Sequence, residues 1–169
     1  TIAGLERLIA AMGRRYDRNP RVAFLQMGFL GFWGEWHTYP RIELFASAAT
    51  QKRVIDACHR AFPNKIVMAR YAGGYAGEQP WLGFFDDMFP EDTDGPEEWK
   101  FLPRMRRSGR TENWKRAAIG GEMVPGAARK WLGPEIERTR AILAASHFSW
   151  VGPYSPALEE ATPEFLDRS

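Results

Sequence analysis

VAFLQMGFLGFWGEWH, residues 22–37, is the stretch that decides the predicted fold. Its first six residues form a run without polar–apolar alternation, which is typical of a strand buried on both faces of a parallel sheet. A loop with three glycines follows, and Glu35 is the only formally charged residue between Arg21 and Arg41. We therefore expect a buried strand that ends in a glycine-rich, aromatic loop.

The rest of the chain alternates between similar apolar runs and amphipathic segments. A helix is predicted over residues 2–16, and Pro20 ends it because proline forces the preceding residue out of the helical region. Further strands are predicted over residues 65–71, 81–89, 117–123 and 147–151, and further helices over residues 44–62, 94–107 and 133–145. This alternation predicts a parallel sheet covered by helices.

Two α/β folds fit this pattern. A five-stranded, open, doubly wound sheet accommodates the 169 residues without remainder. A parallel (β/α)8 TIM-type barrel needs about 250 residues, so the chain would supply only its C-terminal portion, about strands four to eight. Because the chain begins with Thr1, which is not a methionine and directly precedes a predicted helix, we expect residues 1–169 to be a single α/β domain from a longer barrel.

Composition and spacing exclude several classes of function. The formal net charge of +2 is too small to indicate a nucleic-acid partner, and no run approaches the roughly 18 apolar residues of a membrane span. The cations between Arg104 and Arg116 are interpreted as a solvated helix face, since no nucleic-acid-binding motif accompanies them.

Cys58 is the single cysteine, so an internal disulfide is excluded. The glycine spacing in residues 28–34 fits no phosphate-binding loop, and the sequence predicts no cofactor.

Each predicted strand places polar or aromatic side chains at its C-terminal end, where ligand sites lie in both folds. These candidates are Trp33, Glu35, Trp36, His37, Arg70, Tyr71, Asp86, Asp87, Glu122 and Trp150. Aromatic residues make up 14% of the chain, and their ring faces can stack on sugars. Acids and aromatic rings at one edge of a sheet favour a carbohydrate as substrate or ligand.

Glu35 and Glu122 are the candidate catalytic pair. Glycoside hydrolysis needs two carboxyl groups that flank the scissile bond. Poor solvation between Trp33 and Trp36 suits Glu35 as the proton donor, whereas Glu122, kept ionised by Arg70, would serve as the nucleophile. The other candidates at the strand ends would position the sugar.

The segments GFLGFWGEWH (residues 28–37) and AIGGEMVP (residues 118–125) resemble those of DUF4832-type (β/α)8 barrel domains, which are related to the clan A glycoside hydrolases. This resemblance implies a retaining enzyme in which the acid/base Glu35 ends strand four and the nucleophile Glu122 ends strand seven. It also implies that Trp150 ends strand eight and stacks on the sugar. Gly34 departs from the clan, which has a sugar-binding asparagine before the acid/base glutamate.

Other interpretations stay open. The protein could bind carbohydrate without cleaving it, with Glu122 held in a salt bridge to Arg70. Glu35, His37 and the pair Asp86-Asp87 could instead be ligands of a hard metal ion. No HxxxH or HxH spacing accompanies them, so the site is predicted without a metal.

Overall fold

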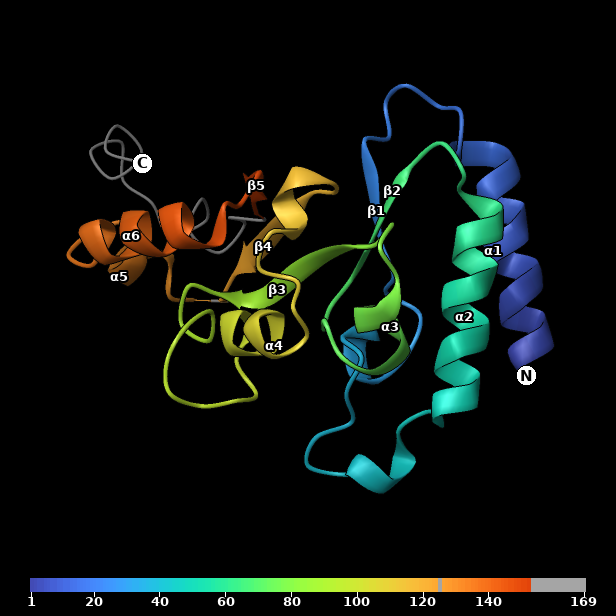
Figure 1. Ribbon diagram of the computed structural model, residues 1–169, viewed down its shortest axis with the longest axis horizontal. Coiled ribbons are helices and arrows are strands. Elements are labelled where there is room, and N and C mark those ends of the chain that lie inside the picture. Colours follow the sequence, from blue (N-terminus) through green and yellow to red (C-terminus); the bar gives the residue numbers. More distant parts are fainter. Residues whose placement is uncertain (125, 153–169) are drawn as a thin grey trace.

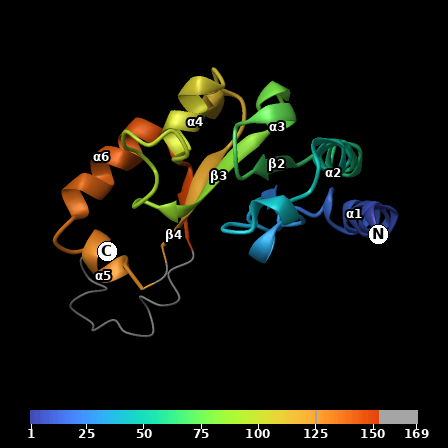
Figure 2. The same cartoon turned by 90° about the horizontal axis from the view of Figure 1, so that it is seen from below.

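A computed structural model describes residues 1–124 and 126–152 and contains one five-stranded, all-parallel sheet. The strands lie in the order of the chain: β1 (Phe24–Gln26), β2 (Ile66–Ala69), β3 (Gly83–Phe89), β4 (Ile119–Met123) and β5 (Trp150–Val151). The sheet curls into a half barrel with β1 and β5 at its two edges (Figure 1). The helices lie in an arc along the outside of the curve (Figure 2).

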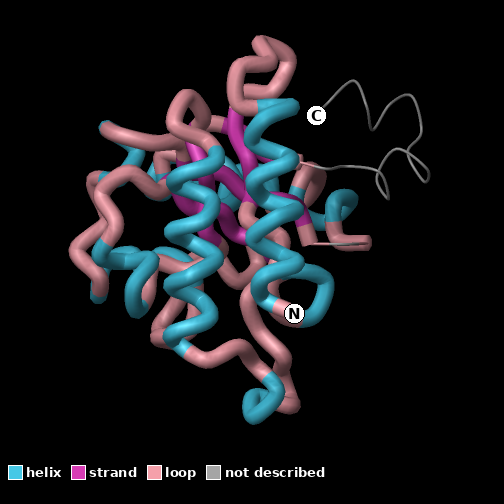
Figure 3. Tube along the Cα trace, turned by 90° about the vertical axis from the view of Figure 1, so that its right-hand side faces the viewer, coloured by secondary structure: helices cyan, strands magenta, loops and turns pink. Residues whose placement is uncertain are grey.

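Two long helices cover the part of the sheet near its edge strand β1. These helices, α1 (Ile2–Tyr16) and α2 (Ala48–Ala61), lie side by side (Figure 3). Hydroxyl caps set their starts, because Thr1 Oγ1 accepts from the Gly4 N–H at 3.4 Å and Ser47 Oγ accepts from the Thr50 N–H at 3.3 Å. The remaining helices are α3 (Gly74–Glu78), α4 (Phe101–Arg107), α5 (Ala128–Trp131) and α6 (Ile136–Ser146), with short 3-10 turns at Phe32–Gly34, Ile42–Leu44 and Asn113–Lys115.

The main apolar core joins the helices to the sheet. Its buried members come from α1, α2 and α4 on one side and from β2, β3 and β4 on the other, and they include Ile9, Val54, Ile55, Cys58, Val67, Phe84, Phe101, Met105 and Ile119. Cys58 is buried in this core as a free thiol. A smaller cluster around Trp131 packs α5 and α6 against the ends of β3 and β4.

Two aromatic rings from the edge strands meet inside the curl of the sheet. Phe24 of β1 and Trp150 of β5 stack with their ring centroids 5.0 Å apart. Gly120 of β4 leaves room for this contact, because a Cβ atom there would lie 2.1 Å from Trp150 Nε1. The curl therefore depends on a residue without a side chain in its middle.

The structure confirms the α/β class, the five parallel strands and the helix before the first strand. The sheet has two free edges, as in the open-sheet alternative, but its strand order lacks the reversal that defines doubly wound folds. No helix in the described part of the chain combines the length and apolar character needed to cross a bilayer.

Several predicted boundaries are wrong. The helix expected from Asp94 begins only at Phe101, because the N–H groups of Phe101 and Leu102 bond back to the carbonyl groups of Asp92 and Thr93. This pairing holds residues 94–100 in turns. The glycine-rich connection after β2 contains α3, and the first strand is half-buried because it forms an edge.

Gly13 lies where α1 contacts α2, and a Cβ atom there would sit 2.3 Å from the carbonyl oxygen of Ala61. We predict that Gly13→Ala lowers the free energy of unfolding by about 1–3 kcal/mol, because the two helices must separate. Gly4→Ala in the same helix is the control. Its nearest contact would be 3.5 Å away, so its stability should stay the same or rise slightly. Urea unfolding measures both variants. An equal loss of unfolding free energy in Gly13→Ala and Gly4→Ala would contradict this explanation.

Candidate functional site

Glu35 stands in a compact loop that follows β1. The Phe32 N–H bonds to the His37 carbonyl oxygen at 2.8 Å, and the Trp36 N–H bonds to the Leu30 carbonyl oxygen at 3.0 Å. These bonds close the loop on itself and fix the position of Glu35 at the C-terminal end of the strand.

Gly34 is required by this loop. Its φ is +82°, and a Cβ atom would lie 2.6 Å from the carbonyl oxygen of Gly28. The left-handed conformation and the close approach both favour glycine. An asparagine at position 34, which the resemblance to clan A would imply, does not fit this backbone.

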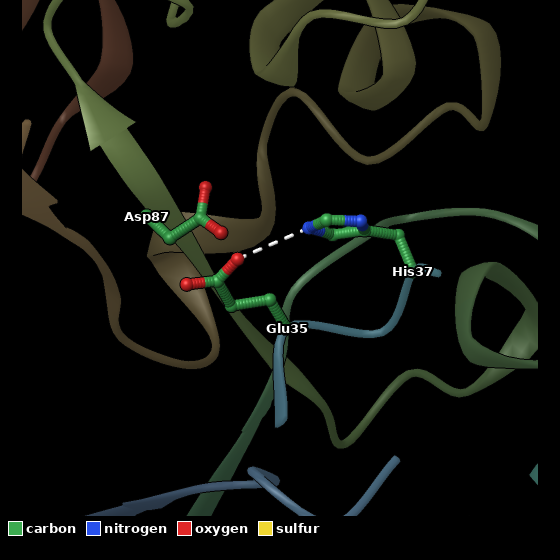
Figure 4. A group of neighbouring side chains, drawn as sticks. All are labelled: Glu35, His37 and Asp87. Atoms are coloured by element: carbon green, nitrogen blue, oxygen red, sulfur yellow. Dashed lines mark hydrogen bonds and ion pairs between the residues drawn. The ribbon is translucent and has the colours of Figure 1, made fainter. Parts of the chain in front are cut away.

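His37 turns back toward Glu35. Its Nε2 lies 3.0 Å from Glu35 Oε2, and its Nδ1 accepts the Tyr39 N–H at 3.2 Å. Because Nδ1 acts as an acceptor, the neutral ring carries its proton on Nε2 and donates it to Glu35. Glu35, His37 and Asp87 point toward one another, with one potential ligand atom of each within 4.8 Å of the others (Figure 4).

Arg70 supplies a buried cation next to this group. It directly follows β2, is 7% exposed, and forms ion pairs with Asp87 and with Asp86, the latter at 3.6 Å. Asp86 also accepts from Thr93 Oγ1 at 2.6 Å and from the Met88 N–H at 3.1 Å. Asp86 is thus held by the protein's own groups, whereas Asp87 faces Glu35.

Burial and crowding of like charges favour the protonated acids. Burial raises the pKa of Asp87 to about 8, opposed by Arg70 and reinforced by the charge of Glu35 and a hydrogen bond to it. The pKa of Glu122 is also raised, first by burial and then by Glu35. Glu35, Asp87 and Glu122 therefore belong to one electrostatic site.

The expected pairing of Arg70 with Glu122 is not what the structure shows. Arg70 forms its ion pairs with the two aspartates, and its lowering effect on the pKa of Glu122 is outweighed by burial and by Glu35. Within residues 1–124 and 126–152, Arg70 and Glu122 therefore form no ion pair, although the binding-only interpretation had expected one. The sequence could not reveal this, because both aspartates and Glu122 end strands near Arg70.

The predicted aromatic residues lie in different surroundings. Trp36 is buried and donates its Nε1–H to the Met27 carbonyl oxygen. Trp33 is 82% exposed, with its ring centroid 6.3 Å from that of His37. Trp150 lies in the curl against Phe24. Of these three tryptophans, Trp33 is the one with a ring face open to solvent beside the acids.

A pocket of about 1140 Å³ adjoins the carboxyl groups through His37 and Arg70, which line it. Other lining residues come from the loop after Glu35, from the loop after β2 and from the segment around α4. Tyr71 is in this lining, together with three residues that the sequence did not single out as ligand contacts: Tyr39, Trp99 and Arg104. The cations near Arg104 were visible in the sequence, but nothing there indicated that one of them turns toward the site.

Comparison of the chain with protein-family models, with curated proteins and with solved structures gives no match. What the site can do is therefore argued from its geometry and its charges.

We predict that Asp87 makes the folded protein less stable as pH rises from about 4 to about 8. Its pKa of about 8 lies above the ordinary value of 3.8, so the folded state binds the extra proton in this window and loses its advantage as the pH rises. In Asp87→Asn this contribution disappears. The melting temperature of wild type should fall more steeply between pH 5 and pH 8 than that of the variant. Parallel curves would contradict the assignment.

Proposed function

We propose that this site cleaves glycosidic bonds with a pair of carboxyl groups. The observation that carries the proposal is the convergence of Glu35, Asp87 and Glu122, from the ends of three strands, in one electrostatic site. Glycoside hydrolysis passes through a transition state with positive charge on the sugar ring. The charged carboxylate of Glu35 in this cluster would stabilise such a charge.

The environments divide the roles between the two glutamates. Glu122 has a raised pKa, so it is suited to hold a proton and donate it to the leaving oxygen. Glu35 accepts hydrogen bonds from His37 and from protonated Asp87, so it is suited to attack the anomeric carbon. Water then cleaves the glycosyl ester, with Glu122 as the base. These roles reverse the order that the resemblance to clan A implies.

We further propose that the half barrel corresponds to the last five strands of a (β/α)8 barrel related to the DUF4832-type domains. Consecutive parallel strands, an inward curl and helices on the outside all support this. In that arrangement Glu35 ends strand four and Glu122 ends strand seven. Retention of the anomeric configuration would follow if the two carboxyl groups approach the spacing of about 5–5.5 Å.

Aryl glycosides with good and poor leaving groups test the two roles. Glu122→Gln should lose at least about 100-fold in kcat/KM on poor leaving groups and much less on dinitrophenyl glycosides, which need no proton. Glu35→Gln should lose activity on both, because the nucleophile is gone. Added azide should restore turnover in the variant that lacks the nucleophile.

Glu43→Gln is the control, since Glu43 is exposed and ion-paired with Arg41 at 2.9 Å outside the cluster. It should keep full activity. Unchanged turnover in both Glu35→Gln and Glu122→Gln would overturn the proposed chemistry. Sugar binding without turnover in the wild type would show a carbohydrate-binding protein instead.

A divalent-cation site is the second candidate function. The observation that favours it is the proximity of Glu35, His37 and Asp87, which together offer two carboxylates and one imidazole. Mn²⁺ and Zn²⁺ accept such mixed ligands. A metal would have to displace the proton of Asp87, so its binding should strengthen as the pH rises toward 8.

Thermal unfolding with and without millimolar Mn²⁺ or Zn²⁺ tests this candidate. If the site holds a metal, the melting temperature of wild type rises by several degrees and that of His37→Gln does not. His59→Gln serves as the control, because His59 is exposed on α2 and its ring contacts Trp81 outside the cluster. Equal shifts in the two variants would contradict a metal at this cluster.

A further inference from the structure

The pocket beside the carboxyl groups contains a half-buried cation whose charge is not balanced by a neighbouring acid. Arg104 lies in α4, and its Nε–H donates to the Trp99 carbonyl oxygen at 2.8 Å. Its guanidinium carbon sits 3.9 Å from the centroid of the Tyr71 ring. Within residues 1–124 and 126–152, Arg104 forms no ion pair, and its two terminal amino groups have no hydrogen-bond partner.

The charges around Arg104 are mostly of the same sign. Burial lowers the pKa of Arg104, and nearby Arg107 and Arg70 lower it further. Partial burial of a guanidinium among other cations costs free energy. The Tyr71 ring and the Trp99 carbonyl offset part of that cost, and a bound anion would offset more of it. The open side of the guanidinium has the fork of donors that binds carboxylate or sulfate groups in a bidentate manner.

The other charged groups that line the pocket do not neutralise the charge of Arg104. Arg70 pairs with Asp86 and Asp87, and Arg107 pairs with Glu98 in an exposed contact of 2.7 Å. Asp92 is the acid in the lining; burial raises its pKa, and the cations that counter this are Lys100 and Arg70. The Nε–H of Arg70 is also buried without an acceptor in the described part of the chain, so the acids next to Arg70 do not satisfy all of its donors.

Aromatic and apolar groups form the outer wall of the pocket. Tyr39 and Trp99 line it and are 73% and 52% exposed, and Ile42 beside them is 75% exposed. Exposed rings of this kind stack on the apolar faces of sugar rings, whose C–H groups point toward the ring. The pocket thus combines a surface for a sugar with donors for an anion.

We propose that this pocket binds an anionic group of the carbohydrate, the carboxylate of a uronic acid or a sulfate ester, with Arg104 as the residue that recognises it. The substrate class is therefore an acidic oligosaccharide. His37 and Arg70 join the pocket to the carboxyl cluster, so the charged sugar lies next to the bond that is cleaved. This inference rests on the proposed function for its chemistry, but the recognition of charge can be measured without turnover.

Calorimetric binding of sulfur-linked oligosaccharides, which resist cleavage by glycosidases, tests the proposal with the full chain. The probes are uronate, O-sulfated and neutral members of gluco, galacto and manno configuration. At least one acidic member should bind about tenfold or more tightly than its neutral counterpart, and added salt should weaken the binding of the acidic member alone. The uronate and sulfate arms show which anion is preferred.

Arg104→Gln should remove this preference, and Arg104→Lys should keep part of it, because lysine retains the charge but not the planar fork. Arg106→Gln is the matched control. Arg106 lies in the same helix but is exposed, pairs with Asp94 at 2.7 Å, and is absent from the pocket lining. The control should bind as wild type does.

Equal binding of acidic and neutral members overturns the inference, as does a failure of every acidic member to bind. An equal loss in Arg104→Gln and Arg106→Gln also overturns it, because it would reflect net charge alone. The binding of an anion and the cleavage of a glycosidic bond can each fail without the other. A charge preference with no cleavage contradicts the hydrolase and leaves the anion pocket, whereas cleavage without charge preference does the reverse.

Discussion

Arg70 places one buried guanidinium at the end of β2 among more carboxyl groups than it can neutralise. Asp86 and Asp87 take its ion pairs, so Glu122 and Glu35 lie in the same site without a dedicated cation. Burial then pushes protons onto Asp87 and Glu122. This shortage of positive charge favours protonated acids beside the charged carboxylate of Glu35, which is the combination that the proposed cleavage of a sugar acetal requires.

The class of fold could be predicted because parallel strands and their covering helices leave different hydrophobic periods in the sequence. The curl of the sheet could not be predicted, because a hydrophobic run indicates that its residues are buried but not which side chains they contact. The stacking of Phe24 on Trp150 across the hollow joins two residues more than a hundred positions apart, and the room for it comes from Gly120. The helix predicted from Asp94 does not begin there, because the N–H groups of Phe101 and Leu102 bond to the carbonyl groups of residues 92 and 93. These bonds between distant parts of the segment could not be predicted from the local sequence.

The proximity of the acids could be predicted because the carboxyl ends of parallel strands meet at one edge of the sheet. The roles of the individual acids could not be predicted from the sequence, because the pKa of each acid depends on its burial and on its distances to other charges. Asp87 was expected to position the sugar or, in the alternative, to bind a metal ion, and the structure places its carboxyl group next to that of Glu35. Arg104 was read as part of a solvated helix face, because the sequence does not show that α4 turns this side chain toward Tyr71.

The central claim is that burial and the charge of Glu35 raise the pKa values of both Asp87 and Glu122. Carbon-13 NMR of the side-chain carboxyl groups, followed over pH in the wild type and in Glu35→Gln, tests it directly and needs no substrate. The account predicts a midpoint near pH 8 for Asp87 and an elevated midpoint for Glu122, with both midpoints falling when Glu35 loses its charge. Ordinary midpoints for both groups in the wild type, unchanged in the variant, would contradict it.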